Sequence, residues 1–366
     1  MVDDGGREHT RAFDRKIDAQ RWVDDQVAGL VTGTHVAPSA GRITFAHWWR
    51  VWSSRQVWTP GTVEAADQAA RSVTFGSVLL ADLRPSHLQA WVKSMTLPAP
   101  SRSGSLAAST IRTRTNYVGM ALRAAVGDRL ISRDPAAKLR LPATRKAAAA
   151  MTIPTPEQVR EAIGAAPDWF RPFVQVCAFA GLRLGEAAGL QLGDIDFLRR
   201  TISIRRQLQG TNVATTTVEA PKYESERVLY VADELLTALA EHVRGIGTRG
   251  PERWLFFSGS DLLNRNSAGN QWRRIREAAG WGEPFTLHDL RHFYASGLIA
   301  AGCDVVTVQR ALGHSSATVT LSTYAHLWPT AEDRTRVASA GLMAAVNGSA
   351  ADQLRTEAVS GAFDLR

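Results

Sequence analysis

The sequence predicts a mainly α-helical protein with a small antiparallel β-sheet, arranged as two domains joined by a linker. Apolar residues recur at helical spacing along most of the 366 residues. β-branched residues gather in one interval, 201–231, between helical stretches. A stretch rich in proline and alanine, 141–155, separates two apolar regions and is typical of a linker.

Residues 1–38 combine a polar start with one expected helix, which Gly33 and Pro38 end. A single helix cannot bury its apolar face alone. The first residues contain no apolar stretch typical of a secretory signal, and no apolar run approaches the ~18 residues of a membrane span. We therefore expect neither secretion nor membrane insertion.

Residues 43–140 are predicted to form a small helical domain, with helices near 44–54, 60–71, 85–95 and 108–127. We interpret its group of tryptophans as core or helix-packing residues, and stacking on DNA bases is the alternative. The group consists of Trp48, Trp49, Trp52 and Trp58.

The chain is basic, with a formal net charge of +8 and a sequence pI of about 10.0. This excess predicts an acidic partner, although charge alone does not choose among DNA, RNA and a membrane surface, or exclude a basic enzyme without such a partner. Residues 102–146 hold ten Lys and Arg but only two acids, so this region is expected either to face phosphates or to form a solvated face. The candidate contacts are Arg112, Arg114, Arg123, Lys138, Arg140, Arg145 and Lys146.

Residues 156–330 are predicted to form the largest unit. Thr155 suits the cap and Pro156 the first position of its first helix. Strands at 201–207, 213–219 and 227–231 predict one three-stranded antiparallel sheet between helices. Helices are expected at 156–165, 168–180, 184–191, 233–244, 268–279, 287–301, 304–311 and 315–323.

The remaining segment, 331–366, is expected to contain one helix at 333–346 and a polar end. The two cysteines, Cys177 and Cys303, lie in apolar stretches and are interpreted as core residues of a reduced protein. Two isolated thiols form neither a disulfide framework nor a zinc site.

Arg183 and Glu186 are predicted to share one face of a helix or tight turn, because they are three residues apart. Glu186 could then hold the guanidinium in place, and a guanidinium carries a planar pair of donors that matches two phosphate oxygens. The alternative is an exposed ion pair of little energetic value.

His288 and Arg291 have the same spacing, at the expected start of a helix, where free amides favour anions. His288 and His292 are four residues apart, a spacing that also occurs in zinc sites. Because Arg291 would place a positive charge on that face and no third ligand is evident, we expect no metal and assign His292 a structural role.

Three further residues have side chains that could take part in a reaction. His314 lies where one expected helix ends at Gly313 and the next begins, and Tyr324 follows ten residues later. Lys222 lies in a turn between two strands. Taken alone, Tyr324 would be a half-buried aromatic residue and Lys222 a solvent-exposed turn residue.

Together these residues suit attack on a phosphodiester without a metal ion. Fixed cations stabilise the charge that develops on the phosphate, a lysine can protonate the leaving oxygen, and a side-chain nucleophile conserves bond energy for rejoining. No carboxylate pair, GxSxG turn or P-loop competes with them. In chain order they are Arg183, Lys222, His288, Arg291, His314 and Tyr324.

Four blocks of this sequence resemble the tyrosine recombinases, also called phage integrases, in order and spacing over about 177–327. They are AGLRLGEAAGLQLGDID, APKYESERVLYV, TLHDLRHFYASGLIAAG and ALGHSSATVTLSTYAHL. The resemblance implies a helical core-binding domain at 43–140, a linker at 141–155, an α+β catalytic domain at 156–330 and a C-terminal helix and tail at 331–366. Residues 1–38 resemble only part of the arm-binding module of many integrases.

The resemblance also implies a role for each residue of the set. Tyr324 would attack the scissile phosphate and form a 3′-phosphotyrosyl bond, while Arg183 and Arg291 clamp the non-bridging oxygens. His314 would also bond the phosphate, and His288 would assist proton transfer at the tyrosine. Lys222 would protonate the leaving 5′ oxygen, and Glu186 would orient its neighbours. The sequence departs from the family pattern at Tyr223 and in the Phe-Tyr pair after His292.

The partner implied by the resemblance is double-stranded DNA at attachment sites, bound by a homo-tetramer that is monomeric when free and uses no cofactor. An accessory DNA-bending or directionality protein is a further expected partner. We expect a cytoplasmic, nucleoid-associated protein encoded by a bacterium or a phage. Alternatives are a catalytically silent DNA-binding protein, an enzyme of the topoisomerase type and a metallohydrolase.

Overall fold

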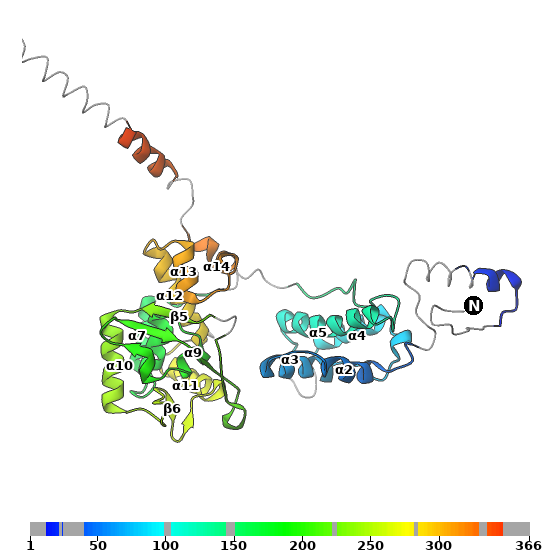
Figure 1. The fold of residues 1–366 in the computed structure, drawn as a ribbon, viewed down its shortest axis with the longest axis horizontal. Helices are drawn as coiled ribbons and strands as arrows, with labels where there is room; N and C mark the ends of the chain where they lie inside the picture. Colours follow the sequence, from blue (N-terminus) through cyan, green and yellow to red (C-terminus); the bar gives the residue numbers. More distant parts are fainter. Residues whose placement is uncertain are drawn as a thin grey trace, which may run out of the picture. The chain divides into compact units, whose positions relative to one another are not determined.

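The computed structural model describes residues 12–21, 24, 40–98, 104–143, 151–221, 225–281, 285–328 and 335–346. The chain divides into two compact units, an N-terminal unit (Met1–Arg145) and a C-terminal unit (Lys146–Arg366) (Figure 1). The division lies inside the stretch 141–155, where the sequence places a linker.

The N-terminal unit is helical in its described part. Its helices are α2 (Phe45–Ser53), α3 (Pro60–Arg71), α4 (Pro85–Met95) and α5 (Ala108–Gly127), with a 3₁₀ turn at Leu80–Asp82. Thr44 caps α2 by accepting the His47 amide at 3.2 Å, and Pro60 and Pro85 each occupy the first turn of their helices.

Tryptophans build the core of this unit. Trp48, Trp49 and Trp52 are buried on α2, and Trp58 is half-buried with its ring 5.3 Å from that of Trp52. The Trp48 indole N–H donates to the Ala121 carbonyl on α5 at 2.7 Å, which satisfies the polar end of a buried aromatic. The interpretation of these tryptophans as packing residues therefore fits their burial.

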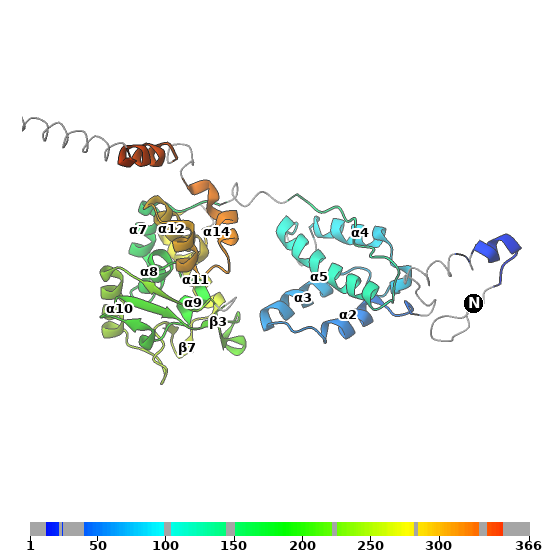
Figure 2. The same ribbon diagram turned by 45° about the horizontal axis from the view of Figure 1, so that its top comes forward.

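The C-terminal unit is a mixture of helices and short antiparallel strands (Figure 2). Its helices are α7 (Pro156–Ala165), α8 (Arg171–Phe179), α9 (Leu184–Ala188), α10 (Asp233–Gly245), α11 (Arg265–Ala278), α12 (Leu287–Ala300), α13 (Val305–Leu312) and α14 (Ala317–Tyr324). Its strands are β1 (Ile195–Asp196), β2 (Thr201–Ile204), β3 (Gln207–Gln209), β4 (Thr217–Glu219), β5 (Arg227–Tyr230), β6 (Phe257–Ser258) and β7 (Asp261–Leu262). The predicted class, mainly α with small antiparallel sheets, is confirmed.

The strands differ from the single three-stranded sheet expected at 201–231. The three-stranded sheet has the order β1-β2-β5, while β3 pairs with β4 in a separate hairpin and β6 pairs with β7. The predicted strand 201–207 is interrupted at Arg205 and Arg206, whose guanidiniums turn to the buried carboxylate of Asp194. Because a buried carboxylate needs cationic partners, this pairing separates β2 from β3.

The core of the C-terminal unit lies around α8, which packs against α12 and α10. The α8 side chains Phe173, Val174, Val176 and Cys177 are buried, and burial raises the pKa of the Cys177 thiol. After α8 the chain turns at Gly181, where φ is +63° and a Cβ would come 2.3 Å from the Tyr294 ring. This position therefore requires glycine, and it places Arg183 directly before α9.

The helices α12, α13 and α14 lie together at one end of the C-terminal unit (Figures 1 and 2). A separate helix at 335–346, close to the predicted 333–346, leaves its apolar residues Val337, Leu342 and Val346 exposed. None of the described helices is long and apolar enough to cross a membrane.

Candidate active site

Arg183 and Glu186 form the predicted pair, and it is buried. Arg183 precedes the first residue of α9, and the Glu186 carboxylate accepts its backbone N–H at 3.0 Å and its guanidinium Nη1 at 2.7 Å. The Glu186 side chain is 1% exposed and that of Arg183 is 22% exposed. The alternative of an exposed surface pair is therefore wrong, and Arg183 keeps an accessible edge.

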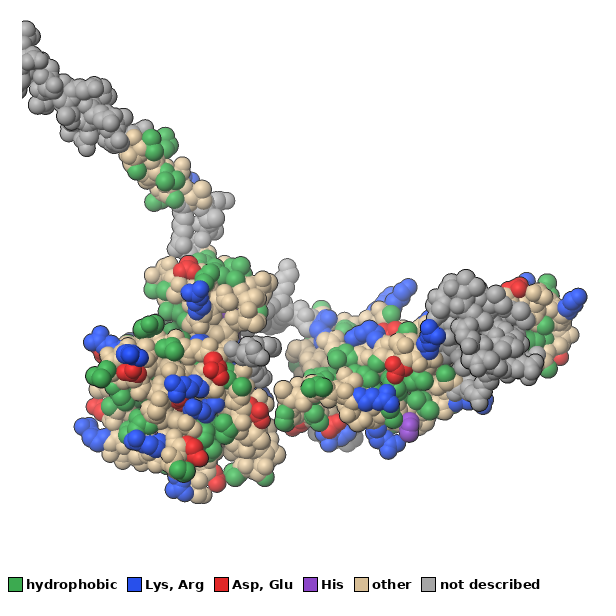
Figure 3. Space-filling view, in the orientation of Figure 1, with side chains coloured by type: hydrophobic (Ala, Val, Ile, Leu, Met, Phe, Trp, Pro, Cys, Tyr) green, Lys and Arg blue, Asp and Glu red, His purple; other side chains and the backbone are tan. Residues whose placement is uncertain are grey.

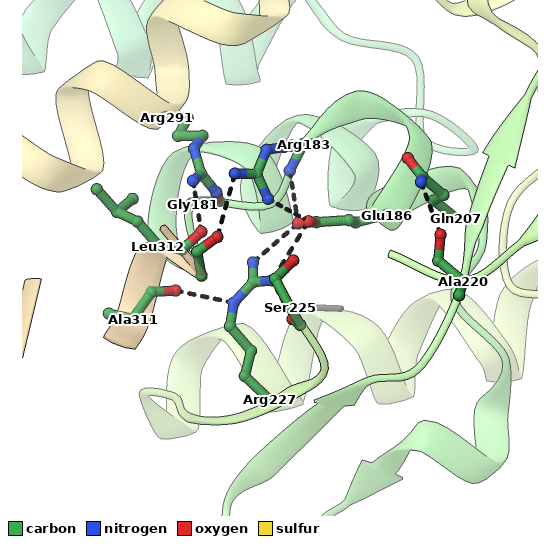
Figure 4. Close-up of polar contacts among 11 residues, drawn as sticks. Gly181, Arg183, Glu186, Gln207, Ala220, Ser225, Arg227, Arg291, Ala311 and Leu312 are labelled. Carbon is green, nitrogen blue, oxygen red and sulfur yellow. Dashed lines mark hydrogen bonds and ion pairs between the residues drawn. The ribbon is translucent and has the colours of Figure 1, made fainter. Parts of the chain in front are cut away.

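Arg227 on β5 is a second partner of Glu186 that the sequence did not single out (Figure 4). Its two terminal nitrogens donate to the Glu186 oxygens at 2.8 and 3.2 Å, and its Nε donates to the Ala311 carbonyl at 3.0 Å. The sequence pattern could have identified Arg227. It shares its strand face with the buried Leu229, and a charge on a buried face needs a partner.

Glu186 is ionised despite its burial. Burial opposes the charge, but the hydrogen bonds and positive charge of Arg227, with the charges of Arg183 and Arg291, lower the pKa of Glu186 to about 2. A carboxyl whose pKa is lower in the folded state stabilises the fold above its unfolded pKa of about 4.3. That contribution is lost as the pH falls from about 4 toward 2.

Replacing Glu186 by glutamine is expected to destabilise the C-terminal unit by about 3–5 kcal/mol at pH 7, because two guanidiniums lose a buried counter-charge. Urea unfolding at pH 7 and at pH 3 measures the difference between the variant and the wild type. The difference in unfolding free energy should be smaller at pH 3, because Glu186 takes up a proton when the wild type unfolds at that pH. An equal difference at both pH values would contradict the electrostatic explanation.

Arg291 lies on α12 and bonds both the turn at Gly181 and the last residue of α13 (Figure 4). Its guanidinium donates to the Gly181 carbonyl at 2.6 Å and to the Leu312 carbonyl at 2.5 Å, and the residue is 1% exposed. Burial, with the charge of Arg183, lowers its pKa to about 9, so it remains a cation at neutral pH. Arg183 also contacts the end of α13, since its Nη2 donates to the Gly313 carbonyl at 3.3 Å.

The start of α12 is fixed by a capping box in which Thr286 donates its backbone N–H and its hydroxyl to Asp289. This places His288 in the first turn, with its ring centroid 4.8 Å from that of His292. Burial, with the charges of His292 and Arg291, lowers the pKa of His288 to about 4. His288 is therefore neutral at physiological pH.

His314 follows Gly313, which ends α13 with a left-handed φ of +61°. A Cβ at Gly313 would come 2.7 Å from the Arg227 guanidinium, so only glycine allows this approach. The His314 Nδ1 lies 2.9 Å from the Thr320 hydroxyl, and its ring is nearly parallel to the Tyr324 ring at 6.4 Å. Burial and the charge of Arg291 lower the pKa of His314 to about 4.

Tyr324 is the last residue of α14 and is 1% exposed. Its hydroxyl lies 2.7 Å from the His292 Nδ1. Burial raises the pKa of Tyr324 to about 12, although the charges of Arg291 and Arg183 oppose the increase. His292 was expected to be structural, and its contact with the hydroxyl is a feature that the spacing of His288 and His292 did not indicate.

The other predicted residues are placed as follows. Lys222, Arg145 and Lys146 lie outside the described residues. Arg112, Arg114 and Arg123 lie on α5, where Arg112 and Arg123 are exposed and Arg114 is half-buried. Exposed Lys138 and Arg140 follow α5. Among the residues that the structure describes, no group of three or more His, Cys, Asp or Glu could hold a metal ion, so His288 and His292 have no third ligand there.

The site thus gathers three guanidiniums, three imidazoles and a phenol from β5, α12, α14, the start of α9 and the turn after α13. They belong to Arg183, Arg227, Arg291, His288, His292, His314 and Tyr324. Fixed cations of this kind favour a phosphate group, and neutral imidazoles can donate or accept one proton each. A phenol is a side chain that can act as a nucleophile and form a covalent ester.

Known proteins match this chain in both sequence and fold. The profile of the Phage integrase family matches residues 154–330. A Sinorhizobium fredii protein named as an integrase/recombinase, y4eF, is 30% identical over 199 residues, which cover 54% of this chain and 71% of that protein. The matched segments cover 58% and 54% of the length of two further integrases.

Solved structures show the same fold. The Tn1549 transposon integrase in complex with a circular intermediate DNA has a TM-score of 0.68 at 18% identity, over 79% of this chain and 96% of that chain. A lambda integrase tetramer bound to a Holliday junction has a TM-score of 0.60 at 18% identity, over 87% of this chain and 93% of that chain. With the residues gathered at α9, α12, α13 and α14, these matches lead to one conclusion: the chain belongs to the phage integrase family of tyrosine recombinases.

Proposed function

We propose that this chain is a site-specific DNA recombinase, an integrase that cuts and rejoins strands through a 3′-phosphotyrosyl bond to Tyr324 without a metal ion. The observation that carries the proposal is that Tyr324 lies within the electrostatic reach of Arg183 and Arg291, with the His314 ring parallel to its own. A tyrosine that serves only as packing does not need two arginines from distant parts of the chain.

Each residue then has one task. Arg183 and Arg291 bind the non-bridging phosphate oxygens and stabilise the charge of the transition state. His314, neutral and held by Thr320, donates to the same phosphate. His288 supports the proton transfer at the tyrosine, and Lys222 protonates the leaving 5′ oxygen. Glu186 keeps Arg183 in position through their 2.7 Å ion pair.

We further propose that the partner is double-stranded DNA and that four copies act together. The DNA complex of the Tn1549 integrase and the tetrameric lambda complex support this proposal, because both share the fold of this chain. Figure 3 shows Lys and Arg side chains on the surface of each unit, which suits contacts with phosphates.

The covalent intermediate can be trapped directly. Duplexes tiled across the DNA that flanks the coding region, each carrying a nick beside a possible cleavage position, should lose a short fragment on cleavage and retain the protein. The expected product resists boiling in SDS, disappears with protease and forms equally with EDTA. Absence of adduct on every duplex would favour a silent DNA-binding protein. Relaxation of an arbitrary supercoiled plasmid would favour a topoisomerase.

The proposed phosphate contacts of the N-terminal unit can be tested by salt. Replacing both Arg112 and Arg114 by alanine should reduce the slope of log affinity against log salt by about two, roughly one per lost contact. Fluorescence anisotropy at several salt concentrations measures it. Arg160→Ala is the control, because Arg160 lies 3.9 Å from Glu157 and already has an acidic neighbour. An unchanged slope in the double variant would place both arginines on the solvent side.

A further inference from the structure

The Tyr324 hydroxyl has a defined partner in the structure. His292 projects from α12, its Nδ1 lies 2.7 Å from the hydroxyl, and the two rings meet edge to face at 5.6 Å. Of the described residues, His292 is the one whose side chain bonds this oxygen. His288, the other histidine of the same helix face, is 4.8 Å from the His292 ring and has no such bond to Tyr324 in the described part of the chain.

The charge states of the two groups allow the hydroxyl to donate this hydrogen bond. Burial keeps the pKa of Tyr324 near 12, so the phenol carries its proton at neutral pH. Burial also lowers the pKa of His292, so this imidazole is neutral. A neutral imidazole has one acceptor nitrogen, and in the tautomer with its proton on Nε2 the hydroxyl donates to the His292 Nδ1.

We propose that His292 is the catalytic base that receives the Tyr324 proton during strand cleavage. This inference rests on the proposed function. As the phenol O–H bond breaks, the proton moves to the His292 Nδ1, and the phenol oxygen forms a bond to phosphorus. The bond from phosphorus to the 5′ oxygen breaks, and that oxygen takes its proton from Lys222. Rejoining is the reverse, with the imidazolium returning its proton to the leaving phenol.

The surroundings of His292 favour its neutral form, which can accept a proton, while one carboxylate on the same helix stabilises the charged form. On α12, Asp289 raises the pKa of His292 while Arg291 lowers it, and His288 is neutral. Facing it from α14 is the Tyr324 phenol itself. Because the tyrosine is the much weaker acid before reaction, proton transfer accompanies O–P bond formation, when the phenol oxygen loses electron density to phosphorus.

This assignment differs from the one implied by the resemblance, in which His288 assists at the tyrosine. In the structure the His288 ring contacts the His292 ring, and it is the His292 Nδ1 that lies 2.7 Å from the phenol oxygen. The inference requires that the contact between α12 and the end of α14 persists when DNA reaches the hydroxyl.

A pH profile of single-turnover cleavage tests the inference with the full chain and the nicked duplex that traps the wild type. The wild-type rate should be nearly flat from pH 7 to 9, because His292 is already neutral. His292→Ala should be about 10²–10⁴-fold slower at pH 7. Its rate should rise about tenfold per pH unit, because hydroxide must then remove the phenol proton.

His292→Asn separates a base from a mere hydrogen-bond partner. Its side-chain oxygen can accept the hydroxyl, but an amide cannot take the proton. We expect His292→Asn to be slow and to keep the steep profile, with melting temperatures of all variants close to the wild type. Tyr294→Phe, a change on the same helix, should keep the flat profile and the wild-type rate. Restoration of the wild-type rate in His292→Asn, or a flat profile in His292→Ala, would overturn the inference.

A substrate with sulfur in place of the bridging 5′ oxygen isolates the nucleophile side of the reaction, because a thiolate leaves without a proton. On this substrate Lys222→Ala should recover, whereas His292→Ala should stay slow. Recovery of His292→Ala would place His292 on the leaving-group side and contradict the inference. If the wild type forms no adduct on any duplex, the proposed function itself fails and the inference falls with it.

Discussion

Replacing Tyr324 by phenylalanine is expected to abolish the covalent DNA adduct while leaving DNA affinity and its salt dependence unchanged. Phenylalanine fills the same buried space and lacks only the hydroxyl. The fold should lose about 1 kcal/mol with the hydrogen bond to His292. Trapping on the nicked duplex, followed by SDS gel electrophoresis, measures the adduct, and anisotropy measures binding.

A matched control is Tyr294→Phe. Tyr294 is a half-buried tyrosine of α12 that packs against Gly181, and burial raises its pKa as it does for Tyr324. This variant should form the adduct at the wild-type rate. Adduct formation by Tyr324→Phe at the wild-type level would remove the phosphotyrosyl mechanism, and loss of adduct in Tyr294→Phe alone would move the nucleophile to Tyr294.

Arg183→Ala is expected to slow cleavage by about 10²–10³-fold with little loss of stability. The cost in rate is typical of removing one fixed donor from a transition-state oxygen. The small cost in stability follows from Arg227, which keeps two hydrogen bonds of 2.8 and 3.2 Å to Glu186. Arg183→Lys should restore only part of the rate, because an ammonium cannot present the planar pair of donors.

Arg227→Ala provides the opposite pattern. Arg227 is more deeply buried than Arg183 and bonds Glu186 together with the carbonyls of Ala311 and Ser225. Removing it should cost about 3–5 kcal/mol of stability, measured by urea unfolding. If Arg183→Ala were as destabilising as Arg227→Ala while cleaving normally, Arg183 would be a structural residue and the proposed phosphate clamp would be wrong.

The sequence predicted the parts of this structure that depend on local spacing. Arg183 and Glu186 share a turn, and His288 and Arg291 share the first turns of α12, because residues three apart lie on one helix face. The corner at Gly313 follows from the rule that glycine ends helices in a left-handed conformation. Membership of the phage integrase family, expected from four sequence blocks, was also confirmed.

The sequence did not reveal features that depend on which elements meet in space. Arg227 bonds Glu186 because β5 passes beside α9, and His292 bonds Tyr324 because α12 packs near α14. The expected three-stranded sheet is divided because Arg206 pairs with the buried Asp194, and this ion pair interrupts the strand between β2 and β3. None of these pairings has a fixed spacing in the chain, so pattern alone could not supply them. The roles of Lys222, Arg145 and Lys146 stay predictions.

The burial of Tyr324 has a consequence for how the protein searches a genome. At 1% exposure, the phenol oxygen is out of reach of any phosphate that slides past the surface. Under the proposed function, a copy bound to unrelated chromosomal sequence would not cut it, because strand cleavage first requires the Tyr324 hydroxyl to become exposed. The fold of the free protein would then prevent cleavage at non-target DNA before any DNA sequence is recognised.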